Sequence, residues 1–342
     1  MTTNIYSRTL LFGVLALLGG CQRVQPFYFE GETQGTTYHI TVAACNNKKS
    51  STELQQLIEA RLVEIDRSLS NYRDDSTLSQ FNRAPIGQWI TLDRDLYAVL
   101  KVSAQMSDDS AGAFDITVAP LVALWGFGPV PRAITDRVIP DERAIEAARQ
   151  HVGYRFLDID PMQPRARKHR DLAIDVNGIA QGYSVDQLAA VLDAQGCTDF
   201  LAEIGGELRI MGKNTEQKPW RIGIEKPGDG VVPTQQTLTG SGIGITTAGD
   251  YQDYFEQDGV RYSHTIDPRT GRPIAHKLAS VTVVAATATL ADGYDTVLEV
   301  LGPEAGLAFA REHHLAAYFI VRDGAGFNAF YTPEMQRYLG DR

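Results

Sequence analysis

Short β-type runs separated by tight turns dominate the second half of the chain. They cover residues 199–212, 219–227, 254–266, 278–286 and 316–331, and Asp258-Gly259 lies within one of them. An Asp-Gly pair between two strand-like runs strongly predicts a two-residue hairpin. Strands joined by such turns must be antiparallel, because parallel neighbours need a crossover connection of a dozen or more residues.

Helical patterns lie among these strands. After Thr52, which we expect to cap a helix, apolar residues recur with helical spacing at Leu54, Leu57, Ile58, Leu62, Ile65 and Leu69. Further helices are predicted over residues 95–106, 140–150, 179–195 and 289–302. Strands are predicted over 37–44, 154–160 and 172–178, and a loop over 70–82. The chain is therefore expected to be α+β, with largely antiparallel sheets and packed helices.

The N-terminus has the pattern of a targeting segment. An apolar run, Leu10–Leu18, follows Arg8 and is too short to span a bilayer. Gly19-Gly20-Cys21 then resembles the end of a bacterial lipoprotein signal, in which the Cys becomes the lipid-bearing N-terminus. An ordinary secretory signal with a chance Cys is the alternative. We expect a signal peptide over residues 1–20, lipidation at Cys21, an exposed tether over 21–32 and one domain over 33–342. The protein would then be lipid-anchored in the bacterial cell envelope, on the periplasmic face of the inner or outer membrane.

Charge and cysteine content narrow the function classes. The net charge of −10 argues against nucleic acid as a partner, because phosphate backbones need basic surfaces. No phosphate-binding loop, HExxH, GxSxG or CxxC motif occurs. Outside the cytoplasm Cys45 and Cys197 could form a disulfide, but the sequence leaves open whether they approach each other.

Residues 291–296, ADGYDT, are a candidate metal site. On a helix, Asp292, Asp295 and Thr296 share one face, and their oxygens suit Mg²⁺ better than zinc. Acidic residues near a helix start also complement the helix dipole, so the motif alone does not distinguish a metal site from an ordinary helix start. The Asn177-Gly178 junction could expose a main-chain carbonyl to a ligand, or could be only a turn that needs glycine.

His264 lies near the end of the expected hairpin. Alternation would place Val260, Tyr262, His264 and Ile266 on one face. A neutral histidine in such a place could accept a proton at near-neutral pH. Taken alone, His264 fits a hydrogen-bonded core histidine better.

Seven motifs in one order combine these pieces: QGTTYHI, SNYRDDSTLSQFN, GAFDITVAPLVALWGFG, DVNGIAQGY, GGELRIMG, AGDYQDYFEQDGVRYSHTIDPRTGRPI and LADGYDT. Together they resemble the ApbE family, the FAD:protein FMN transferases, over about residues 33–330. The resemblance implies an ApbE-like architecture related to the T-fold. It also implies cleavage of the FAD pyrophosphate, transfer of FMN to a Thr hydroxyl through a phosphoester, and release of AMP. Acceptors would be flavoproteins such as subunits of membrane redox pumps.

The resemblance also assigns residues. Mg²⁺ would be held by the Gly178 carbonyl, Asp292, Asp295 and Thr296, and His264 would be the general base. FAD would be bound by Tyr72, Ala113, Phe114, Asp115, Asp175, Gln181 and Ile266, and by Gln34 at a position where the family usually has Met. Glu207 and Ala248 also depart from the family's commoner Asp and Ser.

Two other functions remain open at this point. An FAD pyrophosphatase would use water as the acceptor and yield FMN and AMP. A non-catalytic flavin-binding lipoprotein would need no base, so His264 together with the proposed metal ligands weighs against it.

Overall fold

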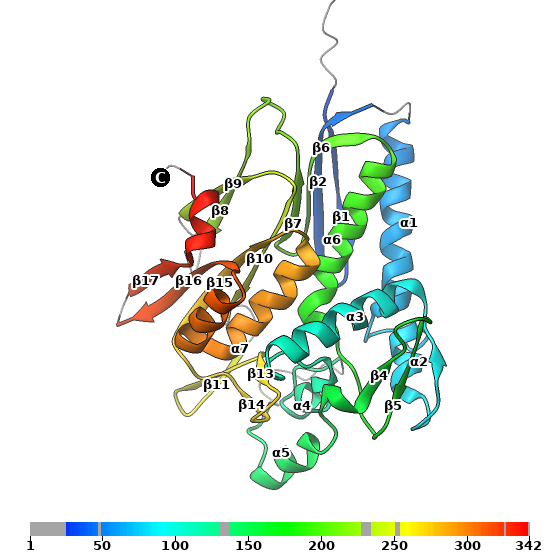
Figure 1. Cartoon of the computed structure of the whole chain (residues 1–342), viewed down its shortest axis with the longest axis vertical. Helices are drawn as coiled ribbons and strands as arrows, with labels where there is room; N and C mark the ends of the chain where they lie inside the picture. Colours follow the sequence, from blue (N-terminus) through cyan, green and yellow to red (C-terminus); the bar gives the residue numbers. More distant parts are fainter. Residues whose placement is uncertain are drawn as a thin grey trace, which may run out of the picture.

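One eight-stranded antiparallel sheet forms the centre of the computed structural model, which describes residues 25–46, 49–129, 137–226, 234–249, 254–324 and 326–340 (Figure 1). The strand order is β1-β2-β6-β7-β10-β15-β16-β17. The strands are β1 (Phe27–Thr33), β2 (Thr36–Cys45), β6 (Cys197–Ile204), β7 (Glu207–Met211), β10 (Ile243–Gly249), β15 (Leu278–Ala285), β16 (Ala316–Asp323) and β17 (Gly326–Tyr331). The predicted α+β class with antiparallel sheet is confirmed.

Smaller antiparallel sheets surround the central one. They pair β3 (Ile90–Thr91) and β4 (Leu157–Ile159) with β5 (Arg165–Lys168), β8 (Trp220–Glu225) with β9 (Thr234–Gly240), β11 (Tyr254–Gln257) with β12 (Val260–Ser263), and β13 (Ile266–Asp267) with β14 (Arg272–Pro273). The expected turn at Asp258-Gly259 joins β11 to β12. Both residues have positive φ, +54° and +75°, as the tight hairpin requires.

Helices cover one face of the central sheet (Figure 1). α1 (Ser51–Leu69) and α6 (Asn177–Ala194) pack on β2 and β6, and α7 (Ala288–Glu312) packs on β10 and β15. On the opposite face, β8, β9 and the C-terminal 3₁₀ turn Pro333–Tyr338 bury Trp220, Leu238 and Met335. A second core lies beside the N-terminal end of α6 and is built from α2 (Thr77–Arg83), α3 (Arg94–Asp109) and the small β3-β5-β4 sheet. The helices α4 (Ala119–Leu124) and α5 (Glu142–Arg149) lie next to this core.

A disulfide joins Cys45 to Cys197. The two residues face each other in the register of β2 and β6, with their Cα atoms 3.8 Å apart. The bond answers the question that the sequence left open and links the N-terminal hairpin to the middle of the chain.

The N-terminal boundary of the domain differs from the prediction. Residues 27–33 form β1, and Phe29 packs in the core opposite Ile40, so an exposed tether through residue 32 is wrong for this stretch. The expected signal peptide and Cys21 lie outside the described residues. Within those residues, no helix combines the length and apolar character needed to cross a membrane.

Three local predictions are also wrong. Residues 172–176 are not a strand, because the Asn82 side chain takes both main-chain groups of Ile174: Nδ2 donates to its carbonyl at 2.9 Å, and Oδ1 accepts from its amide at 2.8 Å. Asn82 itself belongs to α2, which forms where the second half of the loop 70–82 was expected and continues to Arg83. At α1, Ser50 rather than Thr52 is the cap, and it forms a capping box with Glu53.

Candidate functional site

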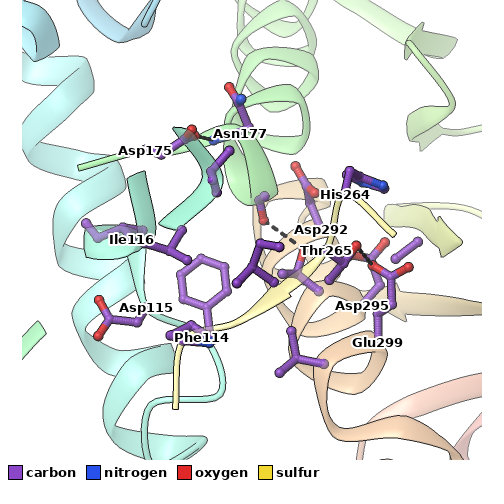
Figure 2. A pocket seen from close by; sticks show the side chains of 18 of the residues that line it. Phe114, Asp115, Ile116, Asp175, Asn177, His264, Thr265, Asp292, Asp295 and Glu299 are labelled. Atoms are coloured by element: carbon purple, nitrogen blue, oxygen red, sulfur yellow. Dashed lines mark hydrogen bonds between the residues drawn. The ribbon is translucent and has the colours of Figure 1, made fainter. Parts of the chain in front are cut away.

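A cavity of about 350 Å³ opens beside the first turn of α6. Seven parts of the chain line it: Tyr72, residues 113–127, residues 175–181, Glu207, the end of β10, residues 264–268, and the face of α7 from Asp292 to Val300. Figure 2 shows Asp292, Asp295 and Glu299 on α7 facing the segment that carries His264 and Thr265. The cavity thus gathers residues that are far apart in the sequence.

Every predicted site residue of the domain except Gln34 lines this cavity. They are Tyr72, Ala113, Phe114, Asp115, Asp175, Gly178, Gln181, His264, Ile266, Asp292, Asp295 and Thr296. Gln34 lies in the β1–β2 turn, where its Nε2 donates to Ser184 Oγ at 2.6 Å. It lines a neighbouring cavity of about 480 Å³ that shares Tyr72 and Gln181 with the first, so the two cavities adjoin.

Side chains of α7 bind the main chain of the first turns of α6. In a regular helix the Gly182 amide would donate to the Gly178 carbonyl. Here the Gly182 amide donates to Asp292 Oδ2 at 2.7 Å, and Thr296 Oγ1 donates to the Gly178 carbonyl at 3.2 Å. Gly178 departs from helical geometry at this point, with ψ +17°. The contacts bring Gly178, Asp292 and Thr296 together between the two helices, and Asp295 lines the same cavity.

The two aspartates of this group lie in a strongly unfavourable electrostatic environment. Burial is the largest cause that raises the pKa of Asp292, to about 7; the Gly182 amide offsets part of the rise and the charge of Asp186 adds to it. Burial also raises the pKa of Asp295 well above its usual value, and the nearby charges of Asp292, Glu207 and Glu299 raise it further. Carboxylates gathered in this way favour either protonation or a bound cation.

The donor set fits a hard divalent cation. Two carboxylates, a hydroxyl and a main-chain carbonyl supply only oxygen, which Mg²⁺ prefers. In the part of the chain that the structure describes, no three His, Cys, Asp or Glu side chains are grouped to hold a metal by themselves. A cation here would therefore depend on Gly178 and Thr296 as well as on the aspartates.

Asp115 and Asp175 are buried at the opposite wall. Burial raises the pKa of both carboxyl groups, and main-chain amides offset the rise in part. Asp115 accepts hydrogen bonds from the Thr117 and Tyr154 amides at 2.8 and 2.9 Å, and Asp175 accepts from the Asn177 amide at 2.8 Å. Their carboxylates thus shape the turns on which Phe114 and the start of α6 depend.

His264 lies just beyond β12, in the short link to β13. The expected alternation stops before it, since β12 ends at Ser263, and Val260 is exposed whereas Ile266 is buried. The half-buried imidazole packs edge-on against Phe127, with the ring centres 6.4 Å apart, and lines the cavity. It is therefore neither sealed in the core nor remote from α7.

Sequence reasoning missed three polar residues of this cavity. Thr265 and Glu299 were not considered, and Glu207 was noted only as a departure from the family pattern. All three side chains are nearly buried, with exposed fractions of 9%, 4% and 9%. The spacing from Asp292 and Asp295 to Glu299 on one helix face was a usable signal for Glu299. The position of Glu207 depends on the tight turn between β6 and β7, and Gly205-Gly206 was the only local signal for that turn.

Comparisons with known proteins all point to one family. The model of the ApbE family matches residues 34–319. An FAD:protein FMN transferase of Klebsiella pneumoniae (strain 342) is 38% identical over 345 residues, which cover 98% of this chain and 97% of the relative. An FAD:protein FMN transferase of Vibrio cholerae (strain O395) is 38% identical over 326 residues, covering 95% and 96%.

Solved structures show the same architecture. The apo form of the Pseudomonas stutzeri flavinyl transferase ApbE aligns with a TM-score of 0.85 and 40% identity, covering 93% of this chain and 98% of that one. The flavin transferase ApbE from Vibrio cholerae aligns with a TM-score of 0.85 and 37% identity, covering 92% and 99%. The chain therefore belongs to the ApbE family of transferases.

Proposed function

We propose that the protein is a Mg²⁺-dependent FAD:protein FMN transferase that attaches FMN to a Thr hydroxyl of a target flavoprotein and releases AMP. One observation carries the proposal: His264 and the oxygen groups of α7 line the same cavity, of about 350 Å³. A base and a set of hard oxygen ligands side by side suit the transfer of a phosphoryl group to a hydroxyl. The names of the relatives support FAD as the substrate and a protein as the acceptor.

The transfer forms one bond and breaks one. The acceptor oxygen bonds to the phosphorus of the FMN half, the bond from that phosphorus to the bridging oxygen breaks, and AMP leaves with the bridging oxygen. A Thr hydroxyl is a weak nucleophile until a base takes its proton. His264 accepts that proton on an imidazole nitrogen, which its place in the cavity allows.

The remaining wall residues bind and orient the substrate. Asp292, Asp295, Thr296 and the Gly178 carbonyl would hold Mg²⁺, which when bound would offset the negative charge of the pyrophosphate. Phe114 and Ile266 offer buried apolar surface, and Tyr72, 70% exposed, stands at the mouth shared by the two cavities.

The proposal is tested with the mature protein, FAD, Mg²⁺ and a flavoprotein acceptor domain. Labelling of the acceptor is followed by in-gel flavin fluorescence, and free FMN and AMP by chromatography. We expect His264→Ala to bind FAD normally but to label the acceptor about 10²- to 10⁴-fold more slowly, the usual worth of a general base. The matched control is His151→Ala, an exposed histidine that does not line the cavity.

The outcomes separate the candidate functions. Labelled acceptor with one AMP per flavin supports transfer, and free FMN without acceptor identifies a pyrophosphatase. Tight FAD binding with neither product identifies a flavin carrier. Equal labelling rates for His264→Ala and the wild type would remove His264 from the role of base.

Lipidation at Cys21 and a place in the bacterial cell envelope, facing the periplasm, complete the proposal. Leu18-Gly19-Gly20-Cys21 supports it as a lipoprotein signal. Metabolic labelling with radioactive palmitate should mark the wild type and not Cys21→Ser, with the label in the membrane fraction. Unlabelled wild-type protein would contradict this part of the proposal.

A further inference from the structure

Glu299 lies on the face of α7 that carries the proposed metal ligands. It follows Asp295 by about one helical turn and Asp292 by about two, so all three side chains point to the same side. Its side chain is 4% exposed and lines the cavity. Nothing in the proposed transfer has yet used this buried carboxylate.

A hydrogen bond connects Glu299 to the segment that carries His264. Thr265 Oγ1 donates to Glu299 Oε2 at 3.0 Å, as the dashed line in Figure 2 shows. The main-chain groups of Thr265 are engaged within its own segment, because its amide donates to Ser263 Oγ at 3.2 Å and its carbonyl accepts from the Ile274 amide at 3.0 Å. The Thr265 side chain therefore reaches across to α7.

The main chain of Glu299 is held by the same part of the protein. In a continuous helix its carbonyl would accept from the amide of residue 303, but residue 303 is Pro303, which has no N–H. His276 Nε2 donates to this carbonyl at 2.7 Å instead, and His276 Nδ1 accepts from the Leu278 amide at 3.3 Å. Residues 265–278 thus bind Glu299 through both its side chain and its carbonyl.

We propose that Glu299 is a positioning residue which, through Thr265, fixes His264 against the oxygen-rich face of α7. The residue next to His264 is tied to the helix that carries Asp292, Asp295 and Thr296, so the base and the metal ligands keep one relative geometry. The catalytic part of this inference rests on the proposed function. The structural part, that the Thr265–Glu299 bond sets the position of the imidazole, does not.

The test removes the hydroxyl of Thr265 while keeping its shape. Thr265→Val has nearly the same volume and cannot donate, whereas Thr265→Ser keeps the donor. We expect Thr265→Val to lower kcat for labelling by about 10- to 100-fold, the cost of a small misplacement of a reacting group, with KM for FAD unchanged. Thr265→Ser should recover most of the loss. Thr270→Val, an exposed threonine of the same hairpin, is the matched control and should resemble the wild type.

A second readout is independent of activity. In protein labelled with ¹⁵N-histidine, the imidazole signals of His264 are assigned by their loss in His264→Ala. They should shift or broaden in Thr265→Val and return in Thr265→Ser. If the wild type proves inactive while these signals still respond, the proposed function fails and the positioning role stands.

Other results would overturn the inference. Equal kcat and equal His264 signals in Thr265→Val and Thr265→Ser would show that the hydroxyl does not position the base. Glu299→Gln keeps an acceptor for Thr265, so we expect a smaller loss of kcat than in Thr265→Val. A raised KM for FAD with unchanged kcat in Glu299→Gln would instead mean that Glu299 contacts the substrate directly.

Discussion

Asp295 is enclosed between α7 and the sheet, where its charge adds to those of Asp292, Glu207 and Glu299. Such a side chain weakens the fold when it is ionised and unpaired, and helps the protein when a cation is bound. The ionised carboxylate of Asp295 thus lowers the stability of the metal-free protein but favours the binding of a cation.

Replacing Asp295 by Asn should separate these two effects. Without added metal, Asp295→Asn is expected to melt at a higher temperature than the wild type at neutral pH, because a buried charge is gone. With Mg²⁺ the wild type should gain stability, about 2.7 kcal/mol at a hundredfold excess over Kd, and the variant should gain much less. Differential scanning calorimetry with and without Mg²⁺ measures both. Asp193→Asn, an exposed change on α6, is the control. If Mg²⁺ stabilised Asp295→Asn as much as the wild type, Asp295 would be excluded as a ligand.

Asp95 shows the opposite case, a buried carboxylate that is fully paired. Arg61 donates to its two oxygens at 2.7 and 2.6 Å, and Tyr183 Oη donates at 2.7 Å. Burial pushes the pKa of Asp95 upward, but the hydrogen bonds from Arg61 and Tyr183 and the Arg61 charge outweigh it, so the pKa lies below its usual value. The network joins α1, α3 and α6 outside the cavity.

The lowered pKa of Asp95 sets the direction in which the free energy of unfolding depends on pH. Stability from Asp95 is fully present above its unfolded pKa, near 3.9, and is lost as the pH falls through the folded value. Asp95→Ala should therefore lower the free energy of unfolding by about 3 kcal/mol at pH 7. Below about pH 4, the difference in unfolding free energy between Asp95→Ala and the wild type should become smaller. Urea unfolding at several pH values measures this. Glu64→Ala, which removes an exposed partner of the same Arg61, should cost less than about 1 kcal/mol, and a difference for Asp95→Ala that stays constant down to pH 2.5 would contradict the assignment.

At the scale of elements, the crossing of α6 and α7 determines the site. Gly182 is the contact point, because a Cβ built there would lie 2.4 Å from the Ala288 carbonyl oxygen and 2.6 Å from Asp292 Cβ. The absence of a side chain lets the Gly182 amide reach Asp292. Any larger residue must move one helix relative to the other.

Gly182→Ala should therefore damage both fold and site. We expect a loss of about 1–3 kcal/mol in unfolding free energy, typical of overpacking, and a weaker Mg²⁺-induced rise in melting temperature because Asp292 is displaced. Gly326→Ala on β17, where the nearest atom to the added Cβ is 3.7 Å away, is the control and should be close to neutral. If Gly182→Ala melts and binds Mg²⁺ like the wild type, the helices are not held at this spacing.

Local patterns predicted some elements and failed for others for identifiable reasons. The stripe of α1 and the Asp258-Gly259 hairpin depend on neighbours in sequence, and both were found. Residues 172–176 have strand-like composition, but Asn82, far away in the chain, takes the hydrogen bonds that a strand would use. The first strand was missed because its partner β2, not its own sequence, holds it in the sheet.

The site was predictable in membership but not in geometry. The ordered motifs led to the predicted residues that converge on the cavity, but not to Thr265 or Glu299. They could not show that Gly182 donates to Asp292 or that Thr265 binds Glu299, because those contacts join segments with no common local pattern. The roles of base and metal ligand remain predictions that the experiments above address.

At the scale of the whole molecule, the disulfide joins regions that fold from distant parts of the chain. Cys45 and Cys197 are 152 residues apart, and the loop they close includes α1, α3 and α6. Closing so long a loop restricts the unfolded chain strongly.

Removing this link should destabilise the protein without changing its chemistry. The double variant Cys45→Ser, Cys197→Ser is expected to lose about 4–5 kcal/mol of unfolding free energy. Below its melting temperature it should keep its rate of AMP release, since neither residue lines the cavity. Denaturant unfolding with and without reductant measures the loss. Reductant should weaken the wild type to the level of the double variant and leave that variant unchanged; a reductant-insensitive wild type would contradict the prediction.

The direction of β1 sets where the cavities lie relative to the N-terminal end of the domain. The strand enters the sheet at Phe27, opposite Val42, and ends at the Gln34 turn beside the cavities, a run of seven residues that spans about 24 Å. A chain fastened to lipid through Cys21 would have its attachment on the Phe27 side of β1 and its cavities at the opposite end of that strand.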